Sequence, residues 1–328
     1  MGFFQNLFHK KNTTRSVLLI DIADNSVAGA YVCRPENERP SILYVERIPV
    51  ERGAVEPHEH KIVSALRVLG DKIIREGAPL LGRATGSGAA GKIIVAVNAP
   101  WQEVHLRIKH YSADNPFLFT PNHTAGALQD ALESPPGKMR VDEDIVGMAL
   151  NGYPTRYPYG REAQHASVST LVSHVERSVA EGVAATLRGL FHTENISLVA
   201  GSALRYQAMR GAFPHERNLY ILDALATPMT LATVENGILV SMREIPEPAA
   251  LIDEVKKLQA HFPSPRTAFV LGAESRAPEL RQALSDAGIT STVAIIPGHF
   301  VGLARHVAPT PPDMNLLLAT LYPQTTLA

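Results

Sequence analysis

The sequence predicts an α/β protein of two lobes, with a small α+β subdomain inserted in the first lobe. Residues 16–34 and 219–235 share one pattern: an apolar strand that ends in or near an Asp, a turn and a second strand. Strands and helices alternate after each of these openings, whereas the stretch between residues 99 and 162 contains short strands and one helix. The expected limits are an N-terminal tail at 1–15, a first lobe at 16–98 and 163–213, the insertion at 99–162 and a second lobe at 214–328.

The composition agrees with a globular chain. Of the 328 residues, 45% are hydrophobic and 19% are charged, which is enough apolar material for two cores. The formal net charge of -1 gives no reason to expect nucleic acid as a partner. A single cysteine, Cys33, suits a reducing compartment. No stretch of 18 apolar residues occurs, and basic residues follow the short apolar start, opposite to a secretory signal, so we expect a cytoplasmic protein.

The first lobe opens with a predicted meander of three strands and continues with an amphipathic helix. Alternating or β-branched residues between turn residues indicate the strands, and apolar residues at helical spacing indicate the helix. A glycine-rich loop follows, and then a continuous apolar run that predicts a buried strand. The expected ranges are strands at 16–22, 26–34, 41–49 and 92–98, the helix at 60–76 and the loop at 79–91.

The same reasoning gives the remaining elements. In the insertion we expect extended segments at 102–111, 143–151 and 155–157 and a helix at 124–133. A stripe of valines and leucines predicts a long helix at 168–191, followed by a strand at 196–200 and a helix at 202–210. The second lobe is expected to contain strands at 219–223, 229–235, 238–244, 267–271 and 292–296, helices at 249–261 and 278–287, and a closing helix from 312.

The loop from Gly86 to Lys92 matches the first seven positions of a Walker A motif, G-x-x-x-x-G-K. That motif also needs a strand before it, a helix after it and a Ser or Thr next to the Lys to hold magnesium. Here Ile93 occupies the hydroxyl position, and an apolar strand follows the Lys. We therefore interpret this segment as a surface loop.

The two strand-Asp-turn-strand openings resemble the paired phosphate loops of the actin-like ATPase superfamily. The closest resemblance is to the branch that holds the cell-division protein FtsA and the pilus-assembly protein PilM. The turn Asn151-Gly152-Tyr153 resembles the end of the inserted subdomain in that branch. The resemblance implies a two-lobed actin-like (ribonuclease H-like) fold, with the adenine-side subdomain reduced or absent because few residues separate the second phosphate loop from the adenosine loop.

The chain departs from the superfamily where phosphate would bind. Glycines let the backbone amides approach phosphate, but Ala23 replaces the glycine of the first loop, and Ala224-Leu225-Ala226 replaces those of the second. Pro228 removes a further N–H donor. We therefore expect a degenerate ATPase with no catalytic residues and no bound cofactor, with ATP and magnesium as the alternative.

Five positions would form a nucleotide site if ATP binds. By the resemblance these are Asp21, Ser26, Asp223, Thr230 and Gly272, with Asp21 and Asp223 as the metal-organising aspartates. A strand-end Asp that caps its own turn is the competing interpretation for both aspartates. In the adenosine loop, Glu274 intrudes after Gly272.

The resemblance implies a scaffold or adaptor on the cytoplasmic face of the inner membrane. It would hold the cytoplasmic segment of a bitopic membrane protein in a groove beside the insertion, among residues 98–162, in type IV pilus assembly. The tail after Pro312 is short and lacks the basic residues of an FtsA membrane helix, which favours this PilM-like hypothesis. The alternative is an FtsA-like cell-division ATPase that binds magnesium ATP and self-associates into polymers.

The N-terminal tail has two interpretations. Phe3, Phe4, Leu7 and Phe8 precede Lys10 and Lys11, so the tail could lie on a membrane surface or dock on a partner. A frayed terminus is the other interpretation, because one or two turns of unsupported helix are marginal in water.

Overall fold

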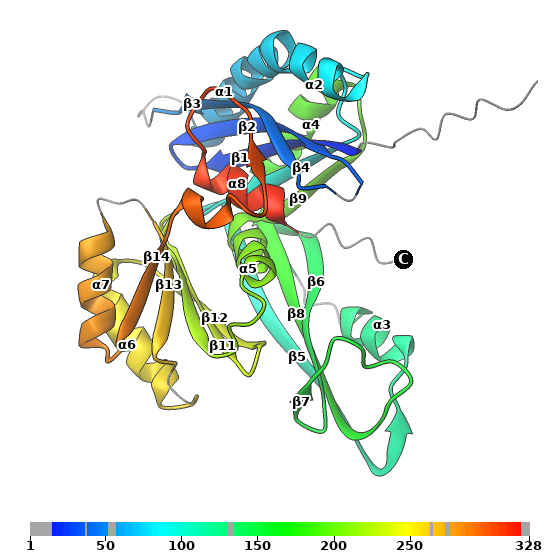
Figure 1. Ribbon diagram of the computed structural model, residues 1–328, viewed down its shortest axis with the longest axis vertical. Helices are drawn as coiled ribbons and strands as arrows, with labels where there is room; N and C mark the ends of the chain where they lie inside the picture. Colours follow the sequence, from blue (N-terminus) through cyan, green and yellow to red (C-terminus); the bar gives the residue numbers. More distant parts are fainter. Residues whose placement is uncertain are drawn as a thin grey trace, which may run out of the picture.

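A computed structural model describes residues 15–36, 38–51, 57–129, 134–262, 265–272 and 276–322. These residues form sheets of six, five and four strands, each with its own helices (Figure 1). The N-terminal tail before Arg15, the end of the helix expected at 124–133, and Glu274 lie outside the described residues.

The first lobe is built on the six-stranded sheet, in the order β15-β3-β2-β1-β4-β9. β1 to β3 form the predicted antiparallel meander, and β4 and β9 run parallel to β1. The strands are β1 (Arg15–Ala23), β2 (Ser26–Arg34), β3 (Ser41–Pro49), β4 (Lys92–Val97), β9 (Ile196–Ala200) and β15 (Arg305–His306).

Three α-helices cover one face of this sheet (Figure 1). They are α1 (His58–Lys72), α2 (Ala78–Thr85) and α4 (Arg177–Phe191), with a π-helical turn at Ile73–Gly77 between the first two. The prediction of a loop at 79–91 is therefore wrong for residues 79–85, which belong to α2. A proline is tolerated in the first turn of a helix, and Leu81 gains full burial there, so the helix continues to Thr85.

The second lobe is the five-stranded sheet, in the order β12-β11-β10-β13-β14, with α6 and α7 packed on its outer face (Figure 1). Apart from one-residue differences at several ends, its strands and α7 match the predicted ranges. Its elements are β10 (Leu219–Asp223), β11 (Met229–Glu235), β12 (Ile238–Ile245), α6 (Pro248–Gln259), β13 (Thr267–Leu271), α7 (Ala277–Asp286) and β14 (Ser291–Ile295).

The insertion is the four-stranded sheet β5-β8-β6-β7, which extends away from both lobes (Figure 1). Its elements are β5 (Gln102–Leu118), α3 (Pro121–Gln129), β6 (Lys138–Leu150), β7 (Tyr153–Pro154) and β8 (Glu162–Glu176). The prediction of a helix at 168–191 is therefore wrong for residues 168–176, which belong to β8. The helix α4 begins at Arg177. β-branched residues favour a strand between two partners, and β8 pairs with both β5 and β6.

Two helices fill the space between the sheets of the lobes: α5 (Gly201–Ala212) and α8 (Met314–Leu321) (Figure 1). They contact each other, and α8 also lies on β1 and β2. The sequence analysis placed this last segment in the second lobe, whereas β15 pairs with β3 and α8 packs on the first sheet. The last helix of the described residues thus packs against the lobe that contains β1. Of the described helices, none has the length and apolarity to cross a bilayer.

Candidate functional site

The two aspartates singled out in the sequence lie where the lobes meet. Asp21 is near the end of β1 and is 1% exposed, and Asp223 is the last residue of β10 and is 6% exposed. Both carboxylates are thus buried close to α5, which connects the two sheets. A buried carboxylate needs hydrogen-bond donors or a cation, and the structure supplies these from the chain itself.

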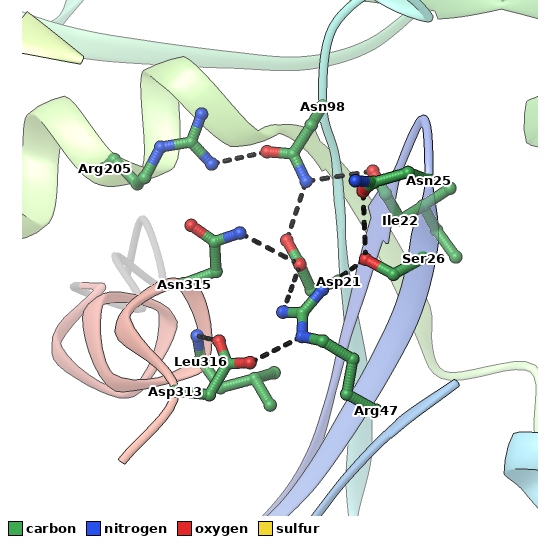
Figure 2. Close-up of polar contacts among 10 residues, drawn as sticks. All are labelled: Asp21, Ile22, Asn25, Ser26, Arg47, Asn98, Arg205, Asp313, Asn315 and Leu316. Carbon is green, nitrogen blue, oxygen red and sulfur yellow. Dashed lines mark hydrogen bonds and ion pairs between the residues drawn. The ribbon is translucent and has the colours of Figure 1, made fainter. Parts of the chain in front are cut away.

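Asp21 accepts hydrogen bonds from three side chains that belong to three different elements (Figure 2). Asn98, just after β4, donates Nδ2 to Oδ1 at 2.7 Å. Arg47 of β3 donates to Oδ2 at 2.9 Å, and Asn315 of α8 donates to the same oxygen at 3.1 Å. Ser26, at the start of β2, does not contact the carboxylate in this arrangement, but its Oγ accepts from Arg47 at 2.7 Å.

Arg47 is also bonded to the C-terminal helix. Its Nε lies 2.7 Å from Oδ2 of Asp313, which caps α8 by accepting a hydrogen bond from the backbone N–H of Leu316 (Figure 2). Burial alone would lower the pKa of Arg47, but the carboxylates of Asp21 and Asp313 outweigh it and raise the pKa above its usual range. Arg47 is therefore a permanent cation that joins Asp21 to α8.

Asp223 has its own buried cation. Nε of Arg205, on α5, lies 2.6 Å from Oδ2 of Asp223, and the side chain of Arg205 is 2% exposed. The other oxygen, Oδ1, accepts from the backbone N–H of Leu225 at 3.2 Å, so Asp223 also caps its own turn. Nη1 of Arg205 donates to Oδ1 of Asn98. A continuous polar chain therefore runs from Asp21 through Asn98 and Arg205 to Asp223 and links the two lobes.

The first residue of α5 allows this chain to form. Gly201 lies so close to Asn98 and Arg205 that an added Cβ would overlap Oδ1 of Asn98 and lie 2.8 Å from Nη1 of Arg205. Only glycine leaves room for both side chains at this helix start.

The remaining predicted positions cluster around Asp223. Thr230, buried at the second residue of β11, is the direct cross-strand partner of Asp223. Gly272 follows β13, where an added Cβ would lie 3.5 Å from Cβ of Ala224. The structure therefore brings Asp223, Thr230 and Gly272 to one edge of the second sheet, and Asp21 and Ser26 to the facing edge of the first.

The sequence analysis missed the side chains that fill this site, namely Arg47, Asn98, Arg205, Asp313 and Asn315. One of them carried a signal: Asn98 directly follows a buried strand parallel to β1, and neighbouring parallel strands present their ends at the same edge. The two arginines and the residues of α8 come from elements distant in sequence, and no local pattern marks them.

This donor set does not fit magnesium ATP. Mg²⁺ requires oxygen ligands in near-octahedral geometry, but N–H donors approach both oxygens of each aspartate. Within the described part of the chain, no group of three His, Cys, Asp or Glu side chains could hold a metal ion. Alanines stand where glycine amides would surround phosphate. As arranged, the residues bind one another rather than a nucleotide and its cation.

Comparisons with solved structures identify the fold. The chain superposes on a chain of the PilM-PilN type IV pilus biogenesis complex with a TM-score of 0.57 and 13% identity. The match covers 94% of this chain and 97% of the matched chain. A protein of Bacteroides thetaiotaomicron with an actin-like ATPase fold and unknown function gives a TM-score of 0.50 and 8% identity, covering 96% and 99%. Neither a protein-family profile nor a curated protein sequence matches the chain.

Proposed function

Since the chain has the predicted actin-like ATPase fold, we propose that it works as a scaffold that binds a protein partner and does not hydrolyse ATP. The observation that carries this proposal is the polar chain from Asp21 to Asp223. Arg205, within that chain, and Arg47, which bonds to Asp21 from β3, neutralise the aspartates that would organise magnesium in an ATPase. The hydrogen bonds of this polar chain link the two lobes without a nucleotide.

The proposed setting is type IV pilus assembly. One solved structure with this fold is the PilM-PilN type IV pilus biogenesis complex, and the match extends along nearly the whole of this chain. We propose that this chain holds a cytoplasmic segment of a bitopic inner-membrane protein, beside the inserted subdomain. The chain would then be a cytoplasmic protein peripheral to the inner membrane.

The partner is tested by calorimetric titration of the full chain with peptides that cover the cytoplasmic tails of bitopic proteins encoded beside its gene. We expect one tail to bind in a 1:1 complex, while a scrambled tail of the same composition does not bind. The scaffold proposal fails if no tail binds at about 1 mM, the weak end of specific recognition.

The alternative function, an FtsA-like cell-division ATPase that polymerises, makes an opposite prediction. A nucleotide that binds only the folded state at 100 times its Kd stabilises it by about 2.7 kcal/mol. We expect no thermal shift of the wild-type chain with millimolar magnesium ATP. A clear rise in Tm that Asp21→Ala and Asp223→Ala abolish, with ATP-dependent sedimentation, would support the alternative.

A further inference from the structure

A cavity of about 500 Å³ opens between the inserted subdomain and the second lobe. Its walls are β6 with the segment that follows it, the end of α5 with the loop after it, and the turn between β11 and β12. The volume falls within the roughly 300–1,000 Å³ of ordinary ligand sites. No residue of the Asp21–Asp223 chain is among the described residues that line this cavity.

The cavity is basic. Its lining includes Arg156, Arg210, Arg217 and His215, and no Asp or Glu is among the described residues that line it. Nη1 of Arg210 donates to the carbonyl of Glu216 at 2.6 Å, which fixes that guanidinium on the cavity wall. Arg156 is exposed. Three permanent cations around one concave surface attract an anionic ligand.

One wall of the cavity is a free strand edge. β7 pairs with β6 only at Ala149 and Leu150, and Thr155 extends this cover by donating to the carbonyl of Met148 at 2.9 Å. On that side of β6, no strand of the described residues pairs with positions 138–148. Residues 145–148 of this edge line the cavity. A free edge offers backbone N–H and C=O groups to an added strand.

The β11–β12 turn and the start of β12 form a further wall of the cavity and pack against a face of β6. Gly147 is packed so closely that an added Cβ would lie 3.1 Å from Cγ2 of Ile238. Since side chains stand on the faces of a sheet, this contact covers a face of β6 and leaves its edge to a segment in extended conformation. In such a chain alternate side chains point to the same side, so carboxylates two residues apart would face the arginines together.

We propose that this cavity binds an acidic, extended peptide segment of the protein partner, which adds a strand to the edge of β6 and directs its carboxylates to Arg156 and Arg217. The inference rests on the proposed scaffold function, because it names the chemistry of the segment that the scaffold holds. Backbone pairing supplies affinity, and the basic wall supplies selectivity for acidic residues.

The test is a fluorescence-anisotropy titration of the full chain with a labelled eight-residue peptide that alternates valine and glutamate. Peptides with lysine or glutamine in place of glutamate test the charge, and a glutamate peptide with N-methylated alternate amides tests strand pairing. The variants are Arg156→Gln, Arg217→Gln and the double variant. Arg161→Gln is the matched control, since Arg161 is an exposed arginine of the same subdomain that does not line the cavity.

We expect only the unmodified glutamate peptide to bind well. Each single variant should weaken it by about 3- to 10-fold, as for partly exposed charge-assisted contacts, and the double variant by more, while the control stays within about twofold of wild type. Added salt should weaken binding. The inference is overturned if the glutamate peptide does not bind, if the glutamine or N-methylated peptide binds as tightly, or if the variants equal the control.

A second titration separates this inference from the scaffold proposal. If the membrane-protein tail binds wild type and the double variant equally, the acidic-segment inference fails and the scaffold function stands. If the glutamate peptide binds as expected but no tail binds, the cavity stands as a peptide site and the proposed scaffold function fails.

Discussion

Removing Arg205 should lower the free energy of unfolding more than removing any exposed charged side chain does. The ion pair with Asp223 is buried on both sides, with side-chain exposures of 2% and 8%. Arg205→Ala leaves Asp223 as an uncompensated buried charge, which costs about 3–5 kcal/mol. At about 1.4 kcal/mol for each factor of ten, the ratio of folded to unfolded protein should fall by roughly 10²- to 4 × 10³-fold. That is a large share of the roughly 5–15 kcal/mol that stabilises a typical protein.

The assay is urea unfolding followed by circular dichroism and by the fluorescence of Trp101, the single tryptophan. Trp101 follows β4 and so reports on the first lobe, whereas circular dichroism reports on both lobes. Because the polar chain links the lobes, the two probes should coincide in the wild type. In Arg205→Ala we expect both midpoints to fall, and the transitions to separate if the lobes unfold independently.

Two comparisons decide whether the pair itself is responsible. Arg188→Ala is the matched control, since Arg188 is a helical arginine whose ion pair with Glu194 has exposures of 49% and 82%, and its loss should cost no more than about 1 kcal/mol. Arg205→Met with Asp223→Asn removes both charges and should cost less than the sum of the single changes by about 2 kcal/mol. Additive losses, or a loss below about 1 kcal/mol in Arg205→Ala, would refute the reasoning.

Two further predictions concern Gly201 at the start of α5 and Asp142 in β6. Gly201→Ala should displace Asn98 and lower the urea midpoint, whereas Gly211→Ala, where an added Cβ meets nothing within 4 Å, should not; equal midpoints would contradict the role of Gly201. Burial, followed by the charge of Asp144, raises the pKa of Asp142 to about 8. The folded state therefore holds this proton more tightly than the unfolded chain does, and the free energy of unfolding falls as the pH rises from 3.8, the usual pKa of Asp, to about 8. The urea midpoint should fall over this range in the wild type and stay flatter in Asp142→Asn, and parallel profiles would contradict this.

The sequence by itself determined the elements whose local pattern has one interpretation. Short apolar or β-branched runs predicted every strand of the second lobe to within one residue, because runs of 5 to 8 residues bounded by turn residues are too short for an ordinary helix. The same pattern located Asp21 near a strand end and Asp223 at one, and the resemblance to actin-like ATPases identified alanines where their phosphate loops have glycines. These features depend on residues close together in the chain.

Only the tertiary structure decided which side chains surround the two aspartates. It also decided that residues 168–176 form a strand and that α8 belongs to the first lobe. The valines of β8 are spaced well for a helix, and it is pairing with strands on both sides that makes this segment a strand. Arg47, Arg205 and α8 reach the site from separate parts of the chain. The hydrogen bonds of Asp313 with Arg47 and of Asn315 with Asp21 form only when α8 lies against the first lobe. Local propensity cannot encode such contacts, because their energy comes from burying groups that are distant in sequence.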